Sequence, residues 1–147
     1  MKNKTLAVWL ALLAGPLGLH RFYLFGWSDL IGWLMPLPAS LGLYGIQRFL
    51  SNGPDDPATW FLLPLLGFTF AGCALNAIVY GLMQVERWNA RFNPNAPLDA
   101  SAGRTGWLTI GAVAISLLVG AAVLIASIAF SFQHYFEYQI ESARQLS

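Results

Sequence analysis

The chain has 147 residues, of which 56% are apolar and only 10% are charged. A soluble domain typically carries about a quarter charged residues, so this composition excludes an ordinary water-facing surface and indicates membrane spans. The net charge of +1 excludes the basic footprint of a nucleic-acid-binding protein. The single cysteine, Cys73, excludes an intrachain disulfide framework and a cysteine-based metal cluster.

Four apolar segments are long enough to suggest membrane crossings, which predicts an all-α membrane protein with four transmembrane helices. We expect them at residues 5–19 (extended through 20 and 21), 30–46, 60–85 and 106–132. Pro36 and Pro38 predict a kink in the second helix. Leu12-Leu13-Ala14 is a poor signal-peptide cleavage site, so we expect the first segment to be retained.

The connections between these segments divide the chain further. A tight turn at His20–Trp27 would make the first two spans a hairpin, followed by a loop that is acidic and rich in turn-forming residues. In the segment after the third span, Arg87 and Arg91 fall on one helical side and Trp88 and Phe92 on another, which predicts a helix at the membrane interface. The predicted units are the hairpin (1–50), the loop (51–59), the third span (60–85), the interfacial segment (86–105), and the fourth span with an amphipathic extension (106–147).

Small residues recur at four-residue spacing in three segments and predict close helix packing. They are Ala7/Ala11/Gly15, Cys73/Ala77/Gly81 and Ala112/Ser116/Gly120. Packing within one molecule is the first interpretation, and self-association is the alternative. Cys73 is expected near the centre of the bilayer.

The orientation in the membrane is nearly balanced under the four-span prediction. One side would carry Lys2, Lys4, Arg48 and Arg144, and the other Arg21, Arg87, Arg91 and Arg104. The positive-inside rule therefore gives a tie. The basic third loop and the acidic second loop favour an N-terminus on the outside.

The sequence contains no phosphate-binding glycine loop, paired-histidine metal motif or nucleophile elbow. His20 and His134 are far apart and are expected to be interfacial polar residues rather than metal ligands. Asn76 is the clearly polar side chain deep in a span, where it makes an interhelical hydrogen bond or lines a pathway. No carboxylate lies at mid-depth, which disfavours an ion-coupled transporter.

The N-terminal 27 residues resemble the TM2-domain family of small membrane proteins. The resemblance is carried by Lys2-Asn3-Lys4-Thr5, by Gly15-Pro16-Leu17-Gly18-Leu19 and by His20-Arg21-Phe22-Tyr23-Leu24. Phe25 stands where the family usually has a glycine, and the second helix lacks the family's closing Trp and Asp. The resemblance implies a TM2-type hairpin in a bacterial inner-membrane protein.

These observations predict a non-enzymatic accessory or interaction subunit without a cofactor. Its partners would be the lipid bilayer and a larger membrane complex or a second copy. The alternative is a small oligomeric transporter or channel component whose balanced charge would permit dual topology, and a membrane enzyme ranks third. Arg21 and Asp29 are expected to form an ion pair that closes the hairpin. The candidate interaction residues are Gly15, Gly18, His20, Arg21, Phe22, Tyr23, Asp29 and Asn76.

Overall fold

The computed structural model describes residues 1–146, and these residues are helical without a β-strand. The elements in chain order are α1 (Lys4–Ala14), η1 (Gly15–Leu17), α2 (Leu19–Phe25), α3 (Leu30–Leu34), α4 (Pro36–Asn52), α5 (Thr59–Leu82), α6 (Val85–Phe92), η2 (Ser101–Gly103) and α7 (Trp107–Leu146). The two η elements are single 3₁₀ turns. The all-α part of the prediction is confirmed.

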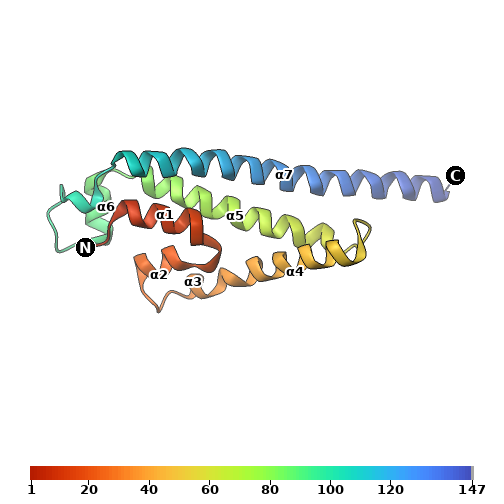
Figure 1. Cartoon of the computed structure of the whole chain (residues 1–147), viewed down its shortest axis with the longest axis horizontal. Coiled ribbons are helices and arrows are strands. Elements are labelled where there is room, and N and C mark those ends of the chain that lie inside the picture. The colour runs from red at the N-terminus through yellow and green to blue at the C-terminus, as the bar shows by residue number, and fades with distance from the viewer. Residues whose placement is uncertain (147) are drawn as a thin grey trace.

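Helix α5 is the centre of the molecule, with α7 on one side and the N-terminal helices on the other (Figure 1). Helices α5 and α7 are antiparallel, since Gly81 near the end of α5 lies beside Val113 near the start of α7. At the opposite end the Trp60 ring stacks on His134 at a centroid distance of 4.8 Å. The last turns of α7 therefore extend beyond the start of α5.

The prediction of four transmembrane helices is wrong. Among the described residues only α5 and α7 are long and apolar enough to cross a membrane, as judged by length and composition. The expected first span ends at Ala14, because Pro16 cannot donate a helical hydrogen bond and Gly18 adopts φ +74°. The expected second span is divided at Met35 into the five-residue α3 and the 17-residue α4, since Pro36 lacks an N–H group.

The expected turn at His20–Trp27 is also placed differently. Residues 19–25 form helix α2, and the chain reverses before them, at η1 and Gly18, and after them, at Gly26. Helices α1 and α2 thus form a short antiparallel hairpin, in which the Lys2 ammonium donates to the Leu24 carbonyl and the Asn3 N–H donates to the Tyr23 hydroxyl. With 11 residues, α1 extends only about 16 Å.

The tip of this hairpin lies beside the middle of α5. A Cβ atom added at Gly15 would lie 2.5 Å from the Cβ of Cys73, so the two backbones approach as closely as glycine permits. Cys73 is buried there. The predicted small-residue ridges therefore pack within the molecule: Ala7, Ala11, Ala77 and Ala112 are fully buried between α1, α5 and α7.

Helices α3 and α4 form an arm that runs along α5 to its first turn. Gly42 and Gly45 lie against Leu66 and Leu62 of α5. A side chain at either glycine would overlap α5, so the glycines set the distance between the helices.

Candidate functional site

The predicted ion pair between Arg21 and Asp29 is present and closes the turn between α2 and α3. Arg21 Nε donates to Asp29 Oδ2 at 2.6 Å and Nη2 donates to Oδ1 at 2.9 Å, which is the two-bond geometry of a guanidinium on a carboxylate. Both side chains are largely buried, with 18% and 14% of their surface exposed. Burial strengthens such a pair because water screens it less.

Local backbone structure places both partners. Gly26 adopts φ +87° and ψ 175°, a region that is essentially restricted to glycine, and its N–H caps α2 by donating to the Phe22 carbonyl. Asp29 is the N-cap of α3 and accepts a 2.7 Å hydrogen bond from the Gly32 N–H. The guanidinium hydrogen bonds from Arg21 lower the pKa of the Asp29 carboxyl group.

A second ion pair, which the sequence analysis missed, repeats this arrangement at the far end of the arm. Arg48 Nε donates to Asp56 Oδ2 at 2.6 Å and Nη2 to Oδ1 at 3.2 Å. Gly53, with φ +85° and ψ −177°, caps α4 by donating to Phe49 O. Asp56 also accepts from the Ala58 N–H just before α5.

The two turns that these ion pairs close share one sequence pattern, Arg-Phe-x-x-x-Gly-x-x-Asp. It occurs at residues 21–29 and again at residues 48–56, with the arginine, phenylalanine, glycine and aspartate in register. A search for internal repeats would have found the second pair from the first. The pattern specifies a helix end, a glycine turn and an acidic residue before the next helix.

His20 precedes the first pair and is fully buried against Tyr80 of α5, at a ring-centroid distance of 6.3 Å. Neither ring nitrogen has a hydrogen-bond partner among the described residues. Burial, followed by the charge of Arg21, lowers the pKa of His20 to about 4, while Asp29 opposes that shift. His20 is therefore neutral in the folded protein at neutral pH. Its two ring nitrogens lose water without gaining a hydrogen bond, so its burial destabilises the folded state.

Replacing His20 by leucine is expected to stabilise the protein by about 1–3 kcal/mol, because the variant buries no unpaired polar atom.

The burial of His20 also makes stability depend on pH. A histidine in the unfolded chain takes up a proton near pH 6.5, whereas the lowered pKa of His20 in the folded protein delays protonation to about pH 4. Stability should therefore fall as the pH drops from neutral toward 4, and His20→Leu should reduce that fall. Thermal unfolding in detergent between pH 7.5 and 4.5 measures both effects. His20→Gln is the control: it should also reduce the pH dependence but gain no stability, and an unchanged pH profile in both variants would contradict the assignment.

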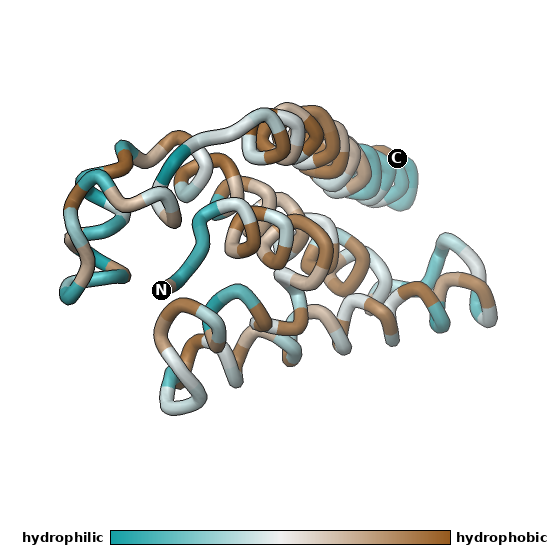
Figure 2. Tube along the Cα trace, turned by 60° about the vertical axis from the view of Figure 1, so that its left-hand side comes forward, coloured by the Kyte–Doolittle hydropathy of each residue, from teal (hydrophilic) through white to brown (hydrophobic). Residues whose placement is uncertain are grey.

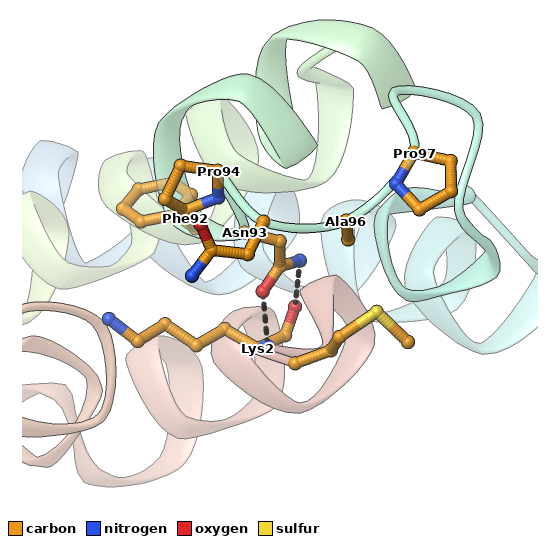
Figure 3. Close-up of a pocket in the computed structure, with 8 residues that line it drawn as sticks. Lys2, Phe92, Asn93, Pro94, Ala96 and Pro97 are labelled. Atoms are coloured by element: carbon orange, nitrogen blue, oxygen red, sulfur yellow. Dashed lines mark hydrogen bonds between the residues drawn. The ribbon is translucent and has the colours of Figure 1, made fainter.

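The N-terminal residues are held against α6 and the loop that follows it. The Lys2 N–H donates to Asn93 Oδ1 at 2.6 Å, and the Asn93 amide returns a 3.1 Å bond to the Lys2 carbonyl (Figure 3). Trp88 Nε1 donates to the same carbonyl at 3.0 Å. A shallow cavity of about 430 Å³ opens beside this contact, lined by Met1, Lys2 and residues 92–97.

Lys4 completes this attachment from the interior. Its side chain is fully buried, and its ammonium group donates to the Met83 carbonyl at 2.6 Å and to the Thr105 hydroxyl at 2.7 Å. Met83 follows the last turn of α5, where unpaired carbonyls favour a cation. Lys4 therefore joins the N-terminus to the end of α5 and to the segment before α7.

The remaining predicted residues lie in two places. Phe22 packs inside the α2–α3 turn, with its ring 5.1 Å from that of Trp27, and Tyr23 accepts the bond from Asn3. Gly15 and Gly18 lie at the tip of the hairpin. Asn76 is separate from this cluster: it is half-buried on α5 and forms no side-chain hydrogen bond with another described residue.

The ion pairs and hydrogen bonds described above hold helix ends and turns together. Within residues 1–146 no three His, Cys, Asp or Glu side chains come together as metal ligands. Comparison with known protein families, with curated proteins and with solved structures finds no match to this chain.

Proposed function

We propose that this protein is a non-enzymatic integral membrane protein of the bacterial inner membrane that acts as an accessory or interaction subunit. The observation that carries the proposal is the exposure of its two most apolar helices. Only 28% of the most apolar 18-residue window of α5 and 11% of that of α7 are buried within the molecule. The core helix of a soluble protein would be mostly buried, so lipid is the environment that fits these surfaces.

The C-terminal part of α7 is the surface that favours an interaction role. Figure 2 shows that α7 is apolar over most of its length and becomes hydrophilic toward the C-terminus. This segment still exposes one apolar face, formed by Phe132, Phe136 and Ile140, each more than half exposed. An amphipathic helix that continues beyond its own bundle is suited to contact a partner helix.

Affinity purification of the intact protein in mild detergent tests this role. We expect a larger membrane protein to co-purify in stoichiometric amount, and Phe136→Ser with Ile140→Ser to reduce its recovery. Gln133→Ala with Gln145→Ala alters neighbouring polar positions and is the matched control. Recovery of a homo-oligomer alone would contradict the accessory role and favour the transporter or channel alternative. Recovery of the protein in the soluble fraction after an alkaline carbonate wash would contradict the membrane proposal itself.

A further inference from the structure

The cationic side chains gather at one end of the molecule, which we call the α6 end. Lys2 contacts Asn93, Lys4 contacts Thr105, and the Arg91 guanidinium lies over the Phe25 ring at 5.9 Å, with Arg21 over the same ring at 4.8 Å. Arg87 and Arg104 belong to α6 and to the segment before α7. Figure 1 places the N-terminus, α6 and the α2–α3 turn together, opposite the C-terminus and the α4–α5 turn.

The charge difference between the two ends is large for so small a chain. The α6 end holds six of the eight lysine and arginine residues and three carboxylates (Asp29, Glu86 and Asp99), a net side-chain charge of +3. The other end holds two cations (Arg48 and Arg144) and four carboxylates (Asp55, Asp56, Glu137 and Glu141), a net charge of −2. Together these give the +1 of the whole chain.

Three of these cations have no carboxylate partner among the described residues. Arg87, Arg91 and Arg104 are exposed, and none forms an ion pair with another described residue. They come from α6 and the segment between η2 and α7, which cover this end of α5. Exposed guanidinium groups without carboxylates fit phosphate oxygens, which they can bind with two hydrogen bonds.

The N-terminal hairpin explains why the count of lysine and arginine residues on the two sides of the membrane was balanced. The balance of four against four required α1 to cross the membrane, which put Lys2 and Lys4 opposite Arg21. Because α1 returns as α2, both lysines lie at the same end as Arg21, Arg87, Arg91 and Arg104, and the count becomes six against two. The expectation of an N-terminus on the outside rested on that crossing.

We infer that the α6 end binds the anionic phospholipid surface of the cytoplasmic leaflet, and that the N-terminus and the α6–α7 loop both face the cytoplasm. Lysine and arginine near membrane segments are retained on the cytoplasmic side, and anionic headgroups attract them. In this arrangement the α1–α2 hairpin enters from the cytoplasmic surface and turns back at Gly15–Gly18, beside the middle of α5. The α3–α4 arm, divided at Met35, then carries the chain to the opposite side, where α5 begins. The inference rests on the proposed membrane location.

Cysteine accessibility in intact cells tests the orientation. The background is Cys73→Ala, and the probes are a cysteine inserted after Met1, Pro97→Cys in the α6–α7 loop and Asp55→Cys in the α4–α5 turn. We expect a membrane-impermeant thiol reagent to label Asp55→Cys in intact cells, and to label the other two only after permeabilisation. If the Met1 and Pro97 probes were labelled from opposite sides of the membrane, the hairpin would be overturned. If both were labelled from outside, or if every probe were labelled in only a fraction of the molecules, the orientation would be overturned. A carbonate-soluble protein would instead contradict the membrane location.

Reconstitution tests the lipid. The purified protein is expected to unfold at a higher temperature in vesicles that contain phosphatidylglycerol than in phosphatidylcholine vesicles. The combined change Arg87→Gln, Arg91→Gln and Arg104→Gln should remove this difference, whereas Arg144→Gln at the other end should keep it. Equal unfolding temperatures in both lipids for the unchanged protein, or an equal loss in both variants, would overturn the headgroup assignment.

Discussion

Gly18→Ala is expected to destabilise the protein by about 3 kcal/mol or more. Gly18 adopts φ +74°, a conformation that costs a residue with a side chain about 1–3 kcal/mol. An added Cβ atom would also overlap the backbone carbonyl of Gly32, which cannot move away as a flexible side chain could. Thermal unfolding in detergent measures the loss.

Two other glycines separate these contributions. Gly26 has φ +87° but open space around it, so Gly26→Ala should cost only the conformational part, about 1–3 kcal/mol. Gly72 lies in α5 with open space and helical dihedrals, so Gly72→Ala should be neutral or stabilising by up to about 1 kcal/mol. Equal losses in all three variants would contradict the close approach of Gly18 to Gly32.

Removal of the Arg21–Asp29 pair is expected to lower the unfolding temperature by several degrees. Arg21→Ala and Asp29→Ala each leave a largely buried charge without its partner, so the double variant should lose little more than the worse single variant. Arg21→Lys should recover only part of the stability, because an ammonium group cannot make both hydrogen bonds in one plane. Thermal unfolding of the unchanged protein, the two single alanine variants and the double variant gives the coupling energy between the two side chains.

The second pair provides the matched control. Arg48→Ala and Asp56→Ala should also be coupled to each other, since Nε and Nη2 of Arg48 again donate to the two carboxylate oxygens. Arg21→Ala combined with Asp56→Ala should be additive, because the 23-residue arm separates the pairs by about 34 Å. Full additivity of Arg21→Ala and Asp29→Ala would show that the ion pair does not stabilise the turn.

Local signals were read correctly from the sequence where one residue determines the geometry. Composition predicted a helical chain, the alternation of arginine and aromatic residues predicted α6, and an arginine eight residues before an N-cap aspartate predicted the first ion pair. The number of crossings was wrong because hydropathy measures how apolar a segment is and not whether it continues in one direction. Pro16, Gly18 and Pro36 carry that information. The kink expected at Pro36 is instead a division between two helices, α3 and α4.

Contacts between distant residues were the part that could not be predicted. Nothing in residues 1–5 indicates that Lys4 will be buried, since a lysine near an N-terminus is ordinarily exposed. Its partners, Met83 and Thr105, become neighbours only after α5, α6 and α7 have packed. The same limit applies to His20, whose burial depends on Tyr80.

The attachment of the N-terminus has a consequence for the order of folding. Lys2 bonds to Asn93, 91 residues away, Lys4 to Thr105, 101 residues away, and Thr5 to Thr109, 104 residues away. These residues therefore obtain their partners only when 91 to 104 further residues have been made, and such distant contacts form slowly. Until then the ammonium group of Lys4 keeps its water, so the hairpin cannot take its final depth beside α5 before α6 and the first turn of α7 are present.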